Sequence, residues 1–201
     1  MPKIVDHEER REQIAEAAWR VILKQGMKGA TVRNIAKEAG LSLGALRHYF
    51  STQDELIFFA MNLVKERVTA RINRIAAQDL PPKQRVYNIL LELVPVDEQK
   101  LAEMEVWYAF TFHVKYMNSA SELDDGIYPG MVRLIEYLDA SGLLREGLDK
   151  EIEAERLYAV VNGTALHALL EPGRLRYERV AQVLKQHLDS ICKAEPGEED
   201  G

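Results

Sequence analysis

One stretch near the N-terminus decides the fold: Thr31-Val-Arg-Asn-Ile-Ala-Lys-Glu-Ala-Gly-Leu-Ser-Leu-Gly-Ala-Leu-Arg-His-Tyr-Phe50. Thr31 and Ser42 are residue types that cap helix N-termini, so they predict one short helix through Ala39 and a second through Phe50. Gly40 lies between the two helices, where a tight turn needs a residue that tolerates positive φ. The stretch therefore predicts two short helices that meet at a sharp turn.

The apolar residues of this stretch fall where two crossed helices bury a common face. Ala36 precedes Gly40 by four residues, at a point where a large side chain would keep the helices apart. The common face is predicted to comprise Ile35, Ala39, Leu41, Leu46 and Tyr49. This is the pattern of a helix-turn-helix, in which the second helix presents an outward face to the major groove of DNA. That outward face comprises Ser42, Leu43, Ala45, Arg47 and His48.

Charge is distributed unevenly along the chain. The 201 residues carry a net charge of −6, yet residues 1–52 have a balance of +3 and the remainder −9. Between Arg20 and Phe50, Glu38 is the single acid among six cations. A polyanion would be drawn to this window and repelled by the rest of the chain. A hairpin of helices that serves only packing would explain Ala36 and Gly40, but it would not explain the lack of acids.

Outside this window the periodicity predicts helices and no strands. Asp6 is expected to cap a first helix that ends at Gly26 and Gly29, and Thr52 with Glu55 forms a capping box. Pro81-Pro82 ends the long helix that follows. The later helices are expected at Thr52–Gln78, Lys83–Val94, Asp97–Asn118, from a cap at Ser121 with Asp124 to Gly142, Asp149–Leu170 and Leu175–Ile191.

Composition narrows the class of protein. Hydrophobic residues make up 47% and charged residues 29%, which is typical of a globular chain. The single cysteine, Cys192, excludes an internal disulfide and a thiolate metal cage. The longest apolar runs fall short of the ~20 residues that a membrane span needs, and the charged N-terminus is unlike a signal peptide. We expect a cytoplasmic protein with no membrane partner, no cofactor and no metal.

The window 31–56 resembles the TetR family of bacterial regulators, whose mark is Thr-x-x-x-Ile-Ala-x-x-Ala-Gly-Val-Ser-x-Gly-x-Leu-Tyr-x-His-Phe followed by Lys-x-x-Leu. The matching residues are Thr31, Ile35, Ala36, Ala39, Gly40, Ser42, Gly44, Leu46, Phe50 and Leu56. Arg47, Tyr49 and Gln53 replace the usual tyrosine, histidine and lysine. The string from Leu43 to Phe50 is similar to the branch that contains betaine-responsive regulators.

We therefore expect an all-α protein of about nine helices. Residues 1–52 would form a three-helix helix-turn-helix DNA-binding domain, and residues 53–201 a helical bundle for ligand binding and dimerisation that ends in an acidic tail at 195–201. The resemblance implies that phosphates are held by Thr31, Ser42, Tyr49 and Gln53. Arg33, Arg47 and His48 are the candidates for base edges, although His48 is expected to pack or touch phosphate. Leu43, Gly44 and Ala45 complete the predicted DNA-binding set.

Residues 97–118 predict a helix that is apolar on two sides, which indicates an interior helix. One interpretation is a plain core helix; the other is the wall of a ligand cavity, with aromatic rings suited to a flat hydrophobic molecule or a quaternary amine. The candidate ligand-binding residues are Met104, Trp107, Tyr108, Phe110, Thr111, Phe112 and His113, with Asn162 and His167 from a later helix. Glu103 and Glu105 are expected to be solvated or to balance a cationic ligand.

The last two predicted helices carry apolar seams that suit a four-helix dimer interface, or packing within one chain. The candidate dimerisation residues are Leu157, Val161, Thr164, Ala168, Val180, Leu184, Leu188 and Ile191. Dimerisation would place two recognition helices ~34–36 Å apart, which suits a palindromic DNA site.

These features predict a ligand-responsive DNA-binding regulator that acts as a homodimer on double-stranded operator DNA, with an unidentified small-molecule effector. The effector would shift the spacing of the recognition helices through the helix from Thr52 to Gln78. Repression is the usual outcome that the resemblance implies. A DNA-binding adaptor controlled by a protein partner is the alternative. An enzyme is a remote one, since the histidines are scattered and no catalytic motif or candidate catalytic residue is present.

Overall fold

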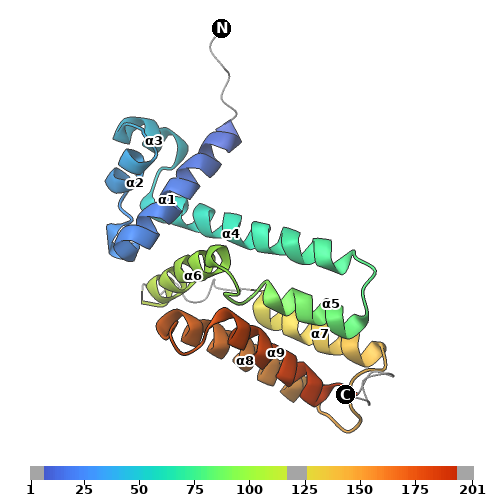
Figure 1. Ribbon diagram of the computed structural model, residues 1–201. Helices are drawn as coiled ribbons and strands as arrows, with labels where there is room; N and C mark the ends of the chain where they lie inside the picture. Colours follow the sequence, from blue (N-terminus) through green and yellow to red (C-terminus); the bar gives the residue numbers. More distant parts are fainter. Residues whose placement is uncertain (1–6, 117–125, 194–201) are drawn as a thin grey trace. The chain divides into compact units, whose positions relative to one another are not determined.

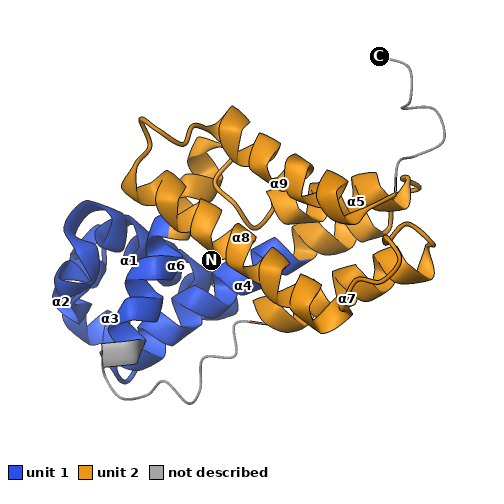
Figure 2. Cartoon of the chain, turned by 90° about the horizontal axis from the view of Figure 1, so that it is seen from below, with its two compact units in different colours: residues 1–69, 105–123 blue, residues 70–104, 124–201 orange. Residues whose placement is uncertain are grey.

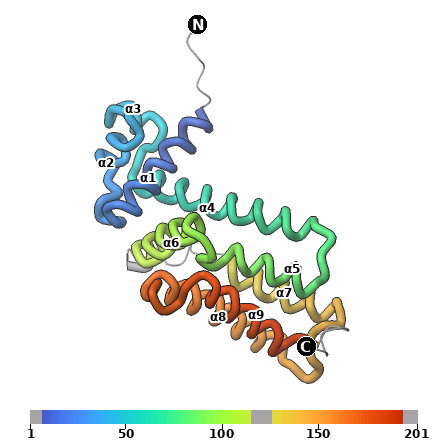
Figure 3. Tube along the Cα trace, viewed as in Figure 1, coloured from blue at the N-terminus to red at the C-terminus, as the bar shows by residue number. Residues whose placement is uncertain are grey.

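The computed structural model describes residues 7–116 and 126–193, and these residues form nine helices (Figures 1 and 3). The helices are α1 His7–Gly29, α2 Val32–Glu38, α3 Leu43–Tyr49, α4 Gln53–Ala76, α5 Pro82–Leu91, α6 Glu98–Tyr116, α7 Ile127–Ala140, α8 Lys150–Leu170 and α9 Tyr177–Ile191. The one extended pairing among the described residues is a bridge between Leu144 and Cys192. The all-α prediction is confirmed.

Helix ends follow the predicted capping chemistry. Thr52 Oγ1 accepts from the backbone N–H of Glu55 at 3.1 Å, and the Glu55 carboxylate accepts from the N–H of Ser51 at 2.8 Å. Asp149 caps α8 by accepting from two backbone N–H groups. α4 ends at Ala76, ahead of Pro81, and Pro82 opens α5 as its first helical residue. The predicted caps at Asp6 and at Ser121 with Asp124, and the acidic tail, lie outside the described residues.

The chain divides into two compact units, residues 1–69 with 105–123, and residues 70–104 with 124–201 (Figure 2). The boundary predicted at residue 52 therefore falls inside the first unit. The reason is burial: Leu56 and Ala60 of α4 and Val106 and Phe110 of α6 belong to the same hydrophobic core as α1, α2 and α3. Both α4 and α6 run from one unit into the other.

The second unit is built by α5, α7, α8 and α9 around their own apolar core. Its core contains all eight residues predicted for dimerisation: Leu157, Val161, Thr164, Ala168, Val180, Leu184, Leu188 and Ile191. Each of these is at most 7% exposed in the single chain. A side chain already covered by its own chain has no surface left for a partner, so this choice of interface residues is wrong. These eight residues instead pack within their own chain, which was the other interpretation of the two apolar seams.

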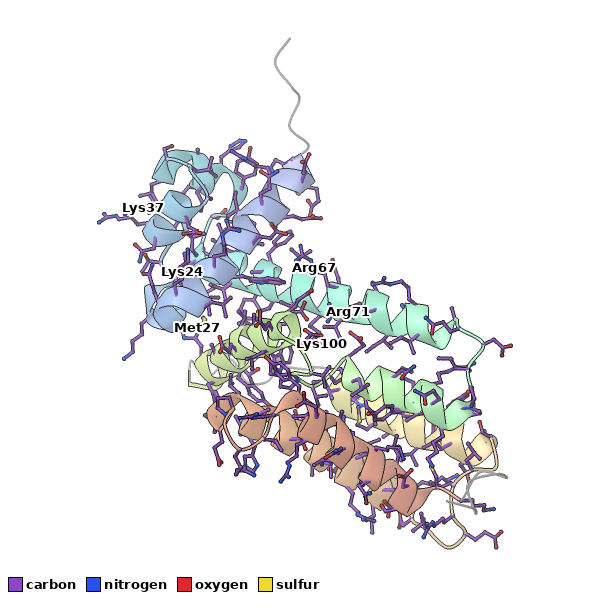
Figure 4. The ribbon with its side chains drawn as sticks, viewed as in Figure 1. Lys24, Met27, Lys37, Arg67, Arg71 and Lys100 are labelled. Carbon is purple, nitrogen blue, oxygen red and sulfur yellow. The ribbon has the colours of Figure 1, made fainter. Side chains whose placement is uncertain are left out.

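A charge network in the second unit joins α4 to α6. The Arg71 guanidinium donates to both carboxylate oxygens of Glu103, at 3.1 and 2.7 Å, and to Glu92 at 2.6 Å. Lys100 lies 3.1 Å from the other oxygen of Glu92 (Figure 4). Glu103 is only 9% exposed, so the expectation that it is solvated is wrong, whereas Glu105 is exposed as expected. Because Glu103 is already paired with Arg71, its charge is compensated within the chain.

His187 of α9 is buried in the second unit, and its Nε2 has no hydrogen-bond partner among the described residues. Burial lowers the pKa of His187, and the positive charge of Arg156 acts in the same direction. Glu153 of α8, also buried, acts in the opposite direction. The folded chain therefore binds fewer protons at this site than the unfolded chain does.

The first prediction concerns stability in acid. As the pH falls below about 6.5, the ordinary histidine pKa, the unfolded chain takes up a proton that the buried His187 resists, so stability should fall with pH in this window. His187→Gln removes the titrating group and should reduce the loss of melting temperature between about pH 7.5 and about pH 5.5. An equally large loss in the variant would contradict the prediction.

Candidate nucleic-acid interface

The two short helices begin as the sequence predicts. Thr31 Oγ1 accepts from the backbone N–H of Asn34 at 3.2 Å, and Ser42 Oγ accepts from that of Ala45 at 3.1 Å. Each hydroxyl thereby satisfies one of the donors that a helix N-terminus leaves free. Both hydroxyls remain at the surface, since Thr31 and Ser42 are exposed.

The turn between the helices is closed by two backbone hydrogen bonds. The N–H of Leu41 donates to the carbonyl of Ala36 at 2.9 Å, and the N–H of Gly40 donates to that of Lys37 at 3.2 Å. This pair of bonds is the Schellman motif, which places the residue after the helix in the left-handed region. Gly40 has φ +67°, as the turn requires.

The inner faces of α2 and α3 are packed as predicted. Ile35, Ala36 and Leu46 are at most 2% exposed and share a core with α1, while Ala39, Leu41 and Tyr49 are partly buried against it. Phe50, which ends α3, is 1% exposed. The same packing orients the opposite face of α3 towards solvent.

The ten predicted DNA-binding residues differ in how far their side chains are exposed to solvent. Thr31, Arg33, Ser42, Gly44, Arg47 and His48 are exposed, and Leu43, Ala45, Tyr49 and Gln53 are half-buried. None is buried in the core, so the face of α3 that the sequence predicts for a major groove is uncovered in the single chain.

The single acid of this window is neutralised. Glu38 accepts from Arg20 at 2.8 Å and lies 3.3 Å from the Lys24 ammonium. The Arg20 guanidinium, followed by Lys24, holds the pKa of the Glu38 carboxyl below its usual value. Lys37 projects outward from α2 (Figure 4), and neither it nor Arg33 forms an ion pair with a described residue. The surface around α2 and α3 therefore keeps an excess of positive charge.

Contacts from α1 to α4 hold the helix pair in place. The Arg11 guanidinium lies over the rings of Phe50 and Phe59, at 4.8 and 4.4 Å from their centroids. Trp19 Nε1 donates to the carbonyl of Ala60 at 3.1 Å. Sequence reasoning missed the role of Arg11, because a cation followed by acids looks like an ordinary surface residue and only the fold brings the two rings beneath it.

The predicted ligand-binding residues are divided between the two compact units. Met104, Asn162 and His167 belong to the second unit, whereas Trp107, Tyr108, Phe110, Thr111, Phe112 and His113 belong to the first. Phe110 is 3% exposed and packs edge-to-face on Phe58, with ring centroids 5.4 Å apart. Phe110 is thus a core residue of the first unit, as the alternative of a plain core helix predicts for this ring. Phe112 is 47% exposed and stacks on Tyr108.

Comparison with known proteins identifies the family. The family model for bacterial regulatory proteins of the tetR family matches residues 14–58, and the model for the C-terminal part of BetI-type transcriptional repressors matches residues 82–193. The chain belongs to the TetR family. It is 63% identical to the HTH-type transcriptional regulator PksA of Bacillus subtilis (strain 168) over 195 residues, which are 96% of this chain and 94% of PksA.

A more distant relative and two solved structures are also similar to this chain. The HTH-type transcriptional regulator BetI of Paraburkholderia phymatum is 30% identical over 111 residues, 55% of this chain and 57% of BetI. A transcriptional regulator from Rhodococcus sp. Rha1 has a TM-score of 0.79 at 28% identity, over 92% of this chain and 99% of that one. A regulator from Saccharomonospora viridis, crystallised in complex with choline, has a TM-score of 0.80 at 20% identity, over 93% and 100%. At 20% identity, the similarity to the Saccharomonospora viridis regulator shows a common fold.

This TetR-family chain is a helix-turn-helix transcriptional regulator and not an enzyme. Within residues 7–116 and 126–193, no cluster of three or more His, Cys, Asp or Glu side chains is arranged to hold a metal ion. None of the helices described is both long and apolar enough to traverse a bilayer.

The second prediction compares two glycines of the helix pair. Gly40→Ala should lower the free energy of unfolding by about 1 kcal/mol, because a Cβ is strained at positive φ even though no atom crowds it. Gly44→Ala should instead raise it by about 0.5–1 kcal/mol, since Gly44 lies inside α3 with open space around its Cβ position. Urea unfolding measures both, and equal effects would refute the conformational role of Gly40.

Proposed function

We propose that this regulator binds a palindromic operator as a homodimer and acts as a repressor that a small-molecule effector releases. The observation that carries the DNA-binding part is the uncovered face of α3, in a window whose single acid is paired with two cations. Such a face attracts phosphate and lets α3 approach base edges. We propose that the protein acts in the cytoplasm, where the operator lies.

The structure supports different roles for the residues of this face. Thr31 and Ser42, exposed at the starts of α2 and α3, suit phosphate contacts together with Tyr49 and Gln53. Gly44 exposes backbone without a side chain, which allows close approach to DNA. Arg47 is exposed on α3 and forms no ion pair with a described residue, so its guanidinium is available for a guanine.

The third prediction tests the reading of DNA by α3. Arg47→Ala should weaken binding to the DNA just upstream of the protein's own reading frame by at least about 1–3 kcal/mol, the value of one arginine–guanine contact, since each chain of the dimer would lose one. Fluorescence anisotropy at matched salt measures the affinity. Arg133→Ala, which removes an exposed arginine of α7, is the matched control and should bind as the parent does. Unchanged affinity of Arg47→Ala would show that α3 is not the recognition helix.

For the homodimer, the surface of α8 offers an alternative to the buried residues. Its exposed side carries one stripe of apolar and small residues at helical spacing: Ile152, Ala159, Gly163, Leu166 and Leu170. Ile152 is 57% and Leu170 66% exposed. Large apolar side chains at this exposure, with glycine and alanine between them, favour close packing against a second helix. We therefore assign the dimer contact to this outer stripe of α8.

The fourth prediction tests this stripe. Gly163→Arg should convert the dimer to a monomer, because the arginine would stand between the two α8 helices. The single chain has open space at the Cβ position of Gly163, so the variant should still fold. Ala140→Arg, at an exposed position of α7, is the control and should remain dimeric. Sedimentation measures the mass, and a Gly163→Arg dimer would exclude the stripe as the interface.

For the effector we propose a hydrophobic molecule or a quaternary amine. The match to the C-terminal part of BetI-type repressors and the choline complex of the Saccharomonospora viridis regulator support this class. Aromatic residues of α6, such as Trp107 and Tyr108, provide the faces that cation–π contacts need. Choline is accordingly the first compound to add to the operator-binding assay. Control by a protein partner is the alternative, and it would leave the complex unaffected by small amines.

A further inference from the structure

Three rings from two distant parts of the sequence meet beside the recognition helix. His7 is the first residue of α1, and His48 and Tyr49 are the last two residues of α3. The centroid of the His7 ring lies 5.0 Å from that of Tyr49 and 6.3 Å from that of His48, and the His48 and Tyr49 centroids are 5.5 Å apart. In Figure 3 the first turn of α1 lies close to α3, as these distances require.

This ring cluster is at the surface. His7 and His48 are exposed, and Tyr49 is half-buried against the core of the first unit. The ring nitrogens of His7 and His48 have no hydrogen-bond partner among the residues that the structure describes. Tyr49 thus forms the base on which His7 packs, and the imidazole N–H groups remain available to an external acceptor.

The charges of α1 are segregated around His7. At 100° per residue, Arg10 and Arg11 lie on the same side of the helix as His7, whereas Glu8, Glu9 and Glu12 lie on the other side. From α3, the cation Arg47 is the neighbour of His48. From α4, Glu55 lies 3.8 Å from the Arg11 guanidinium, which balances it. With Arg11 balanced by Glu55, the excess positive charge near His7 comes from Arg10 of α1 and Arg47 of α3.

We propose that His7 is a DNA-contacting residue: its imidazole, held on Tyr49 and beside His48, donates a hydrogen bond to a backbone phosphate at the end of α3. The proposal rests on the proposed operator binding through α3. A neutral imidazole offers one N–H donor and an imidazolium offers two, and the charged form binds phosphate more strongly. Contact with phosphate therefore favours uptake of a proton, and DNA binding becomes tighter as the pH falls.

Each chain of the proposed homodimer supplies one such contact, so two contacts to the DNA strengthen together as the pH falls. Because a phosphate contact does not depend on base sequence, the effect should appear on operator and on arbitrary duplex alike.

The fifth prediction is a comparison of His7 variants in this pH range. Full-length protein is titrated at low salt with the upstream fragment and with a short duplex of arbitrary sequence. His7→Phe keeps a ring to pack on Tyr49 but has no donor and no charge, so its affinity should rise by a smaller factor than that of the parent between about pH 7.5 and about pH 6, with His48 supplying the remainder. His7→Gln keeps an N–H donor without titrating, so it should show the same reduced dependence on pH but bind more tightly than His7→Phe. Arg133→Gln removes a positive charge elsewhere and should retain the parental gain.

The outcomes separate this inference from the proposed function. Thermal unfolding of each variant verifies that α1 and α3 are intact. A parental gain in His7→Phe and His7→Gln would overturn the role of His7 while leaving operator binding through α3 in place. Failure of the parent protein to bind either duplex at any pH would overturn the proposed function, and this inference with it.

Discussion

The burial of Ile35 and Leu46 against α1 is the interaction on which the DNA-binding part of this protein depends. Helices of seven residues are too short to be stable alone, because nucleation costs more than so few hydrogen bonds return. Their stability must come from packing, and α1, the first half of α4 and the second half of α6 supply the surface. Since the inner face of α3 is fixed by Leu46 and Phe50, the outer face has a defined direction.

The charged side chains of α1 and α2 set the electrostatic potential of the DNA-binding surface, whose shape is determined by packing. The pairing of Glu38 with Arg20 and Lys24 ties α1 to α2 and at the same time removes the one negative charge from the window. Exposed ion pairs of this kind stabilise a fold only slightly, so their effect on the local potential is the more important one. Arg10 lies on the side of α1 that carries His7, away from the glutamates of that helix, and extends the positive surface to the ring cluster of His7, His48 and Tyr49.

Two helices, α4 and α6, run through both compact units. The two helices contact each other in the first unit and again in the second. In the first unit Phe58 of α4 packs on Phe110 of α6. In the second unit Arg71 of α4 pairs with Glu103 of α6 in a largely buried site. Loss of Arg71 would leave the Glu103 carboxylate buried and uncompensated, which is costly. α4 and α6 are thus in contact in both units, and α4 begins directly after the turn that follows α3.

The sequence by itself determined the helices, the caps at Thr31 and Ser42, the turn at Gly40 and the inner faces of α2 and α3, because these depend on local chemistry and on periodicity. It also predicted the family, since the relevant residues are contiguous. Only the tertiary structure decided which of the two apolar sides of α8 is internal, so Leu157 and Val161 proved to be core residues. A helix with two apolar sides does not encode which side its own chain will cover. Glu103 was misjudged for the same reason: its partner, Arg71, is far away in the sequence and meets it only in the folded chain.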